Sequence, residues 1–329
     1  MNRAAPEERE ARLAERRARL SAEQRHLLEQ RLRVRGPKAD EARAAPSSLV
    51  AIQPSGPRPP LFCVHPAGGD ILCFQPLSRH LGMDQPFYGL QSQGLGAGEE
   101  SLASIEEMAA SYRAEIAQVT SGPYHLAGWS LGGAVAFELA RQLAAAGKEV
   151  ALLALVDATP GLWPQPAGGK VEDEVDEEDD AYWLMEIADY LKRLWGVDLG
   201  LSYEILNALP PETQMLHFVS RLKDTPFGAA GAGLEPLRRL LGVFKTNVRA
   251  FRLYRPGTYP GPITLFRPAQ ATGEPEDEAA AADPTLGWGA LSPHPVKIET
   301  VPGDHISALA EPHVRTLAGR LRTCIDQAL

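Results

Sequence analysis

The segment Tyr124-His-Leu-Ala-Gly-Trp-Ser-Leu-Gly-Gly133 decides how this chain is expected to fold. The apolar residues Tyr124–Gly128 predict a strand, and the Ala- and Leu-rich residues Leu131–Ala146 predict a helix that ends at a glycine. Ser130 then lies on a turn so tight that the residues two positions before and after it must be small, and both are glycines. A Gly-x-Ser-x-Gly turn exposes the serine hydroxyl at the carboxyl end of a strand. The segment therefore predicts a nucleophilic serine.

Short apolar runs and helical patterns continue on both sides of this turn. Such alternation is typical of a mostly parallel sheet that is covered by helices on both faces. Together with the serine turn, it predicts the α/β fold class and, within it, the α/β-hydrolase fold. The further expected strands are Leu61–His65, Phe87–Gln91, Leu152–Asp157, Ile263–Arg267 and Val296–Val301, and the further helices are Ile71–Leu81 and Ser104–Val119.

Residues 161–250 interrupt the alternation. They begin with a Pro- and Gly-containing segment and an acidic run, Glu172–Asp180, which predicts a flexible solvated loop. Because the strand pattern resumes afterwards, we expect an inserted helical subdomain between two parts of one core, residues 48–160 and 251–329. Its expected helices lie around Tyr182–Trp195, Glu212–Leu222 and Leu234–Phe251.

Residues 1–47 form a leader of different composition. Leucines seven residues apart, from Leu13 to Leu27, predict helix. Two interpretations stay open: a poorly ordered extension, or a linker or docking helix that needs a partner to bury its apolar stripe. The Gly36-Pro37 pair ends the helical pattern, and residues 36–60, rich in Pro, Ala and Ser, are expected to be a linker.

Composition and charge limit the possible partners. Of the 329 residues, 44% are hydrophobic and 23% charged, which is typical of globular proteins. Residues 1–45 hold 12 Lys/Arg and 8 Asp/Glu, a net charge of +4, so the remainder carries −13 within the overall −9. An acidic body disfavours nucleic acid as a partner. The sequence has no long apolar segment and no secretory signal, so we expect no membrane association and a cytoplasmic location. The three cysteines lack metal-ligand spacing, which predicts no metal site.

A serine nucleophile needs a base, and His305 is the best placed of the eight histidines. In this fold the chain order is serine, acid, histidine. His305 directly follows the last expected strand and opens the loop before the final helix. The neighbouring Asp304 is expected to shape the turn.

Two places could supply the acid that orients His305. Asp157 closes the strand after the nucleophile, at the edge of the sheet where Ser130 is expected. The alternative is the loop after Ile263–Arg267. We favour Asp157, because a strand end beside a core rarely carries an unpaired charge and because the rival loop is long and Ala-rich. That loop offers Glu274, Glu276, Asp277 and Asp283.

Acyl transfer also requires backbone N–H groups that stabilise an oxyanion. The residue after the nucleophile supplies one, here Leu131. The segment Leu61-Phe-Cys-Val-His-Pro-Ala-Gly-Gly69 has the form of the loop that supplies the other, and Ala67 is the natural donor because Pro66 has no N–H. His65 is expected to brace this loop.

With these residues assigned, the chain from about residue 48 to 329 resembles the type I thioesterase domains that terminate nonribosomal peptide and polyketide assembly lines. The resemblance rests on several motifs in the family's order. It supports Asp157 as the acid and implies that the inserted helices are a lid over the acyl channel. The motifs are His65-Pro-Ala-Gly-Gly69, Gly128-Trp-Ser-Leu-Gly-Gly133, Leu155-Val-Asp157, the segment Tyr254–Phe266, Gly287-Trp288 and Gly303-Asp-His305.

The resemblance implies a small-molecule acyl thioester substrate, carried on the phosphopantetheine arm of an acyl or peptidyl carrier protein, and no cofactor. The acyl-serine would then be released by water or by an internal nucleophile that closes a ring. Two alternatives stay open: a general carboxylesterase or lipase with the same triad, and an interaction module on a hydrolase scaffold. The second is disfavoured because nucleophile, acid, base and oxyanion loop are all present.

Overall fold

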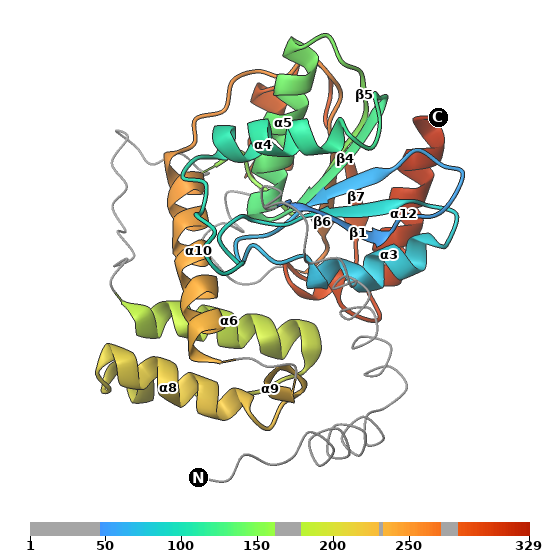
Figure 1. The fold of residues 1–329 in the computed structure, drawn as a ribbon. Helices are drawn as coiled ribbons and strands as arrows, with labels where there is room; N and C mark the ends of the chain where they lie inside the picture. The colour runs from blue at the N-terminus through green and yellow to red at the C-terminus, as the bar shows by residue number, and fades with distance from the viewer. Residues whose placement is uncertain (1–46, 162–178, 230–232, 271–281) are drawn as a thin grey trace, which may run out of the picture.

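Seven strands form one sheet in the part of the chain that the computed structural model describes, residues 47–161, 179–229, 233–270 and 282–329. Their order across the sheet is β1-β3-β2-β4-β5-β6-β7. All neighbouring strands are parallel except β1, which pairs antiparallel with β3 (Figure 1). The strands are β1 (Leu49–Gln53), β2 (Leu61–Val64), β3 (Phe87–Leu90), β4 (Tyr124–Trp129), β5 (Val150–Val156), β6 (Thr264–Pro268) and β7 (Lys297–Val301).

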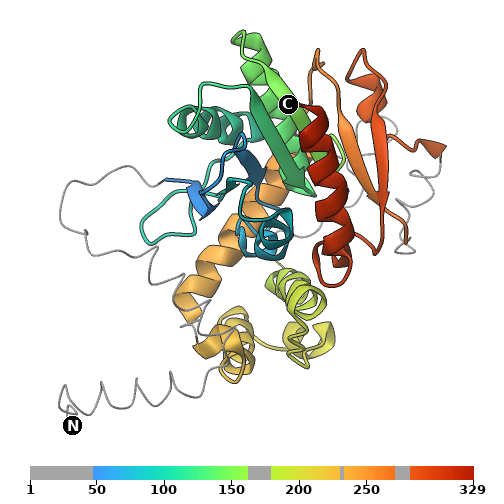
Figure 2. The same ribbon diagram turned by 90° about the vertical axis from the view of Figure 1, so that its right-hand side faces the viewer.

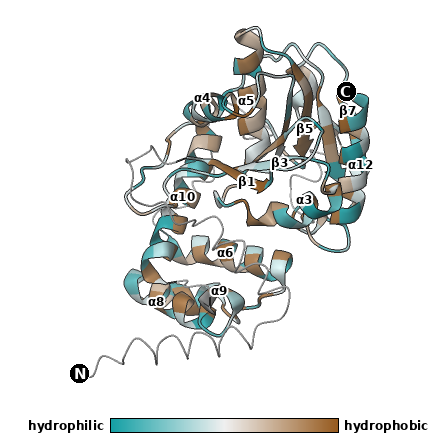
Figure 3. Cartoon of the chain, turned by 45° about the vertical axis from the view of Figure 1, so that its right-hand side comes forward, coloured by the Kyte–Doolittle hydropathy of each residue, from teal (hydrophilic) through white to brown (hydrophobic). Residues whose placement is uncertain are grey.

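Helices cover both faces of the sheet, because successive strand residues point to opposite sides. Leu61 and Cys63 of β2 pack into one hydrophobic cluster, whereas Phe62 and Val64 pack into the other. Figure 2 shows the sheet between these helical layers, and Figure 3 shows hydrophobic residues concentrated along the strands. One layer contains α4 (Ile105–Ile116) and α5 (Leu131–Ala145), and the other contains α3 (Gln75–Leu81) and α12 (Val314–Gln327).

A group of helices lies between β5 and β6 in the chain. Apolar side chains of α6, α8 and α10 form a hydrophobic cluster separate from the two beside the sheet. The long helix α10 reaches from this group to the helices of the core (Figure 1). How the chain divides into domains stays a prediction. The helices are α6 (Asp180–Trp195), α7 (Tyr203–Asn207), α8 (Pro211–Leu222), α9 (Pro226–Ala229) and α10 (Leu234–Leu253).

The register of the central strands determines where functional residues can meet. Val64 of β2 pairs with Gly128 of β4, and Gly128 pairs with Leu155 of β5. The three strands therefore end at almost the same level. The segments that follow them gather at one edge of the sheet, as expected for parallel strands.

The expected strands agree with the observed ones to within two residues at each end, but one strand was missed. β1 lies within residues 36–60, which were wrongly expected to be only a linker. It is an edge strand in a Pro-rich stretch, so composition hides it. Its start is held by Glu115 of α4, whose carboxylate accepts hydrogen bonds from the backbone N–H groups of Ser48 and Leu49. Residues 1–46, which contain the expected leader helix, lie outside the described residues.

Two helical predictions also need correction. The helix expected at Ile71–Leu81 is divided into a 3-10 turn, η1 (Leu72–Phe74), and the helix α3, whose second residue is a proline. The acidic run Glu172–Asp180 does not end as a loop. Its last two residues begin α6, where the Asp179 carboxylate accepts from the Tyr182 N–H and caps the helix. Residues 172–178 lie outside the described residues.

Candidate active site

Ser130 lies between β4 and α5 with φ 56° and ψ −131°, which is a strained conformation for a residue with a side chain. Two backbone hydrogen bonds hold it: its N–H donates to Val156 O at 3.1 Å and its carbonyl accepts from Gly133 N at 2.9 Å. A Cβ atom at Gly128 would lie 2.0 Å from Gly132 O. One at Gly132 would lie 2.4 Å from the His65 carbonyl oxygen. The two glycines are therefore required by close backbone contacts, as the motif predicts.

The structure brings Ser130, His305 and Asp157 together. His305 Nδ1 lies 2.8 Å from Asp157 Oδ2, and its Nε2 lies 3.2 Å from Ser130 Oγ. Because a carboxylate only accepts hydrogen bonds, Nδ1 carries the proton and Nε2 is free to accept the serine proton. The site is partly open, since 37% of the His305 side chain and 21% of the Asp157 side chain are exposed.

Asp283 and Asp304, the other acidic candidates that the structure describes, accept hydrogen bonds from their own turns and not from the His305 ring. Asp283 accepts hydrogen bonds from Thr285 and from the Gly287 N–H within its own turn. Asp304 accepts from the N–H groups of Ile306 and Ser307, so it shapes the turn as expected. Glu274, Glu276 and Asp277 lie outside the described residues.

The loop that carries His305 is held by groups that sequence reasoning missed. The Trp129 indole N–H donates to the His305 carbonyl at 3.0 Å, and the two rings lie 5.5 Å apart. Tyr190 of α6 stacks on Trp129 with ring centroids 6.0 Å apart. Arg193 Nη2, one turn further along α6, lies 2.7 Å from Asp304 Oδ1. Trp129 could have been suspected from its place beside Ser130, whereas no sequence signal marks the two α6 residues.

The two expected oxyanion donors are available. Neither the Ala67 N–H nor the Leu131 N–H donates to an acceptor among the residues that the structure describes. Leu131 begins α5, where backbone N–H groups point outward and favour negative charge. Ala67 lies in the loop after β2, and this loop packs against the serine turn: a Cβ atom at Gly132 would lie 2.4 Å from the carbonyl oxygens of Val64 and His65.

His65 braces the loop that contains Ala67, as predicted. Its ring is buried, with Nδ1 2.8 Å from the Pro66 carbonyl oxygen and Nε2 2.8 Å from the Tyr112 hydroxyl. Since the carbonyl only accepts, Nδ1 carries the proton and Tyr112 donates to Nε2. Burial lowers the pKa of His65 to about 4, against the opposing effect of the Pro66 hydrogen bond, so the ring stays neutral near pH 7.

Within the described ranges, no three or more His, Cys, Asp or Glu side chains are grouped so that they could hold a metal ion. In the same ranges, no helix has the length and apolar character needed to cross a bilayer.

The sheet, the strained serine turn and the chain order Ser, Asp, His together define the class of the protein as a serine hydrolase of the α/β-hydrolase fold. Comparison with known families is more specific. A family model described as the thioesterase domain matches residues 59–324. The chain therefore belongs to the thioesterase domain family.

Similar curated proteins are much longer synthases. The chain is 35% identical over 225 residues to a dimodular nonribosomal peptide synthase of Bacillus subtilis, covering 67% of this chain and 8% of that protein. It is 33% identical over 294 residues to chondramide synthase of Chondromyces crocatus, covering 87% of this chain and 7% of that protein. The chain thus spans less than a tenth of each.

Solved structures of nonribosomal peptide synthetases and thioesterase domains have the same fold. A four-domain synthetase, AB3403, aligns with a TM-score of 0.73 at 26% identity, covering 90% of this chain and 21% of that chain. The Vlm2 thioesterase domain aligns with a TM-score of 0.61 at 28% identity, covering 84% of this chain and 96% of that one. The alignment therefore covers nearly all of this solved, isolated thioesterase domain.

Proposed function

We propose that this chain is a serine thioesterase that releases an acyl, peptidyl or polyketide chain from the phosphopantetheine thioester of a carrier protein, in natural-product biosynthesis. The observation that carries the proposal is the hydrogen-bonded arrangement of Ser130, His305 and Asp157. Family membership adds the thioester as the class of bond, and the synthases among the similar proteins add the carrier protein as partner.

The proposed chemistry has two halves. His305 Nε2 accepts the proton of Ser130 as Oγ attacks the thioester carbonyl carbon, and Asp157 stabilises the imidazolium that forms. The oxyanion accepts hydrogen bonds from the N–H groups of Ala67 and Leu131. His305 then gives its proton to the pantetheine thiol as the C–S bond breaks, which leaves an acyl-serine. In the second half, water or an internal hydroxyl or amine attacks the acyl-serine with the same base, so that the product is an acid or a ring.

The helices of residues 161–250 are proposed as a lid over the bound acyl group, inserted between core segments 48–160 and 251–329. Two contacts of α6 support this assignment, because they place the inserted helices directly beside the site: Arg193 with Asp304 of the His305 loop, and Tyr190 with Trp129, next to Ser130. We propose no cofactor, because each chemical step above is supplied by side chains and backbone N–H groups of this chain. A cytoplasmic location is supported by cysteines 63, 73 and 324, which are all free thiols.

A carboxylesterase with the same triad is the second candidate, and the choice of leaving group separates the two. Rates should be compared for an acyl-pantetheine thioester and for the oxygen ester with the same acyl group. We expect a clear preference for the thioester and a fall in kcat of about 10⁴–10⁶-fold for Ser130→Ala. A strong preference for the oxygen ester would defeat the proposed substrate class.

Labelling with a fluorophosphonate separates an enzyme from a non-catalytic interaction module. We expect a covalent adduct on the wild-type protein and none on Ser130→Ala. If neither protein forms an adduct, the chain is not a serine hydrolase.

Intact-mass analysis after loading with a panel of acyl-pantetheines reports which acyl groups reach Ser130. It also shows whether each group leaves as an acid, by reaction with water, or as a ring.

A further inference from the structure

Asn247 is a fully buried amide on α10 whose polar contacts lie within the loops beside the site. Its Nδ2 donates to the Ala67 carbonyl oxygen at 2.9 Å, and its Oδ1 lies 3.4 Å from the Ser92 hydroxyl. A buried amide costs stability unless it is hydrogen-bonded, so its position is specified by these partners. Asn247 therefore joins a helix of the insertion to the loop that contains the proposed oxyanion donor.

The hydrogen bonds around Ala67 hold both of its peptide groups. The peptide before Ala67 is held through the Pro66 carbonyl, which accepts from His65 Nδ1 at 2.8 Å and from Gly69 N at 2.9 Å. In a planar trans peptide the N–H points opposite to the C=O, so these two bonds direct the Ala67 N–H. The peptide after Ala67 is held through the Ala67 carbonyl, by Asn247. Only with both planes held are the two backbone torsions of Ala67 fixed.

The packing of α10 leaves this loop little room to move. A Cβ atom at Gly69 would lie 2.6 Å from Val243 Cγ1 and 2.8 Å from Ser92 Cβ. The Gly69 carbonyl also accepts from the Ser92 N–H at 2.9 Å. One turn of α10, from Val243 to Asn247, therefore supplies both the apolar surface and the polar contact against which the loop rests.

We infer that Asn247 is a positioning residue for the oxyanion loop, an inference that rests on the proposed function. The hydrogen bonds to the Pro66 carbonyl direct the Ala67 N–H, and Asn247 holds the peptide that follows Ala67. Asn247 thereby limits rotation of the loop about Ala67, which would carry this N–H away from where negative charge develops in the transition state. Donors of this kind stabilise the transition state more than the bound substrate, so misplacing one lowers kcat and leaves KM almost unchanged. Alignment of the site then depends on how α10 of the insertion is seated.

The test replaces Asn247 by leucine and by alanine in the full chain and measures kcat and KM with an acyl-pantetheine thioester. Rates are expressed per folded molecule, counted from urea unfolding curves. We expect kcat to fall about 10–100-fold, less than the loss of a whole oxyanion donor, with KM within about threefold of wild type. The affinity of a boronic acid, which forms a tetrahedral adduct with the serine, should fall with kcat/KM.

Tyr254→Phe is the matched control. Tyr254 is also buried at the end of α10, and its hydroxyl, which the substitution removes, donates to Glu138 of α5 at 2.9 Å and not to a residue of the triad or the oxyanion loop. It should lose stability and keep kcat. The inference is overturned if the Asn247 variants keep wild-type kcat, if Tyr254→Phe loses kcat equally, or if neither Asn247 variant folds, because Asn247 would then be purely structural. If the wild type shows no Ser130-dependent turnover, the proposed function itself fails.

Discussion

At Ser130 and Asp157 the backbone adopts positive φ values, 56° and 41°, that side-chain-bearing residues rarely adopt. Each residue directly follows a parallel strand and donates its N–H to the neighbouring strand, Ser130 to Val156 O and Asp157 to Phe266 O. These two hydrogen bonds extend the sheet by one residue on each strand, and they compensate for the strained backbone conformation. The chain turns away from the strand at each of the two residues, and both side chains lie within hydrogen-bond distance of the His305 ring.

His65 predicts how stability depends on pH. In the unfolded chain its pKa is near 6.5, whereas burial lowers the native value to about 4. As the pH falls from 6.5 to 4, the unfolded state binds a proton that the native state does not, so this histidine lowers the free energy of unfolding. The loss approaches about 3 kcal/mol at pH 4 and is absent above about pH 7.

Urea unfolding of wild type and His65→Gln at pH 7, 6 and 5 measures this effect. The variant should be less stable at pH 7 and should depend less on pH. His294→Gln replaces an exposed histidine and should keep the wild-type dependence. Equal slopes for wild type and His65→Gln would contradict the assignment.

At the scale of elements, two helices of the insertion each contact one loop of the site. α10 contacts the loop after β2 through Asn247, and α6 contacts the loop after β7 through Arg193. Tyr190 of α6 also stacks on Trp129 at the end of β4, whose indole N–H holds the His305 carbonyl. The catalytic loops are thus held from outside the sheet by helices that are distant in sequence. The inserted helices are therefore in direct contact with the loops that carry the proposed site.

Asp304 has two separable roles, which two substitutions distinguish. Burial raises its pKa, but hydrogen bonds from Ser307, the charge of Arg193 and the Ile306 N–H together lower it. Asp304→Asn keeps an acceptor for the turn and loses the partly exposed ion pair, so we expect a cost below about 1 kcal/mol that shrinks in high salt. Asp304→Ala also loses the turn and should cost about 1–2 kcal/mol more, with lower kcat as the His305 loop loosens. Unfolding curves and kcat, each measured at two salt concentrations, report the contributions of the ion pair and of the turn. Identical stability and kcat of the two variants would show that Asp304 does not have two separable roles.

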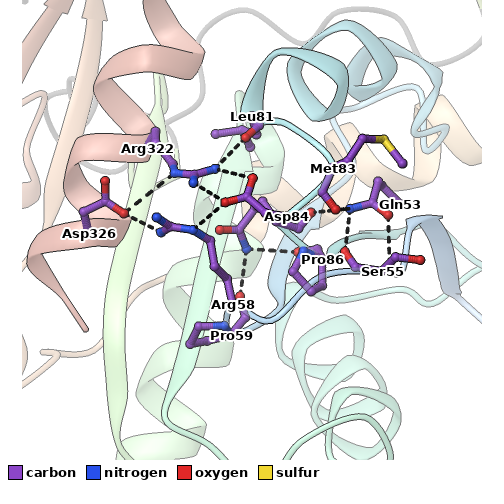
Figure 4. Close-up of polar contacts among 11 residues, drawn as sticks. Gln53, Ser55, Arg58, Pro59, Leu81, Met83, Asp84, Pro86, Arg322 and Asp326 are labelled. Atoms are coloured by element: carbon purple, nitrogen blue, oxygen red, sulfur yellow. Dashed lines mark hydrogen bonds and ion pairs between the residues drawn. The ribbon is translucent and has the colours of Figure 1, made fainter.

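At the scale of the whole molecule, a network of charged side chains links α12 to the segments that precede β2 and β3 (Figure 4). Arg322 of α12 binds the Asp84 carboxylate with both Nη atoms, Arg58 binds Asp84 and Asp326, and the Arg322 Nη1 also donates to Leu81 O at 2.7 Å. Asp84 and Arg58 precede β3 and β2, so the network lies at the amino ends of strands whose carboxyl ends bear the site. It joins the last helix to the first strands.

Arg322→Ala should therefore lower stability and leave catalysis intact. We expect Tm to fall by about 2–4 °C and kcat to stay within twofold of wild type, because the network lies at the far end of the strands. Arg315→Ala on the same helix removes a more exposed ion pair with Glu311 and should change Tm little. Thermal unfolding and turnover of the three proteins decide this. A large loss of kcat in Arg322→Ala would show that the two ends of the sheet are coupled.

Local patterns in the sequence determined the six strands β2 to β7, the helices that follow them, and the positions of Ser130, Asp157, His305, Ala67 and Leu131. These features can be predicted because each rests on a short-range requirement: an apolar run, a glycine at a close backbone contact, or a residue directly after a strand. Strand order then brings the ends of parallel strands to one edge.

Other features were decided only by the tertiary structure. β1 is formed by pairing with β3 and by Glu115, not by its Pro-rich composition. Asn247, Arg193 and Tyr190 carry no local motif, since each acts by contacting a residue more than fifty positions away in the chain. The sequence by itself therefore determined which groups perform the proposed chemistry, because those groups follow strand ends. Tertiary packing decided what holds them in place, because that depends on which distant side chains meet.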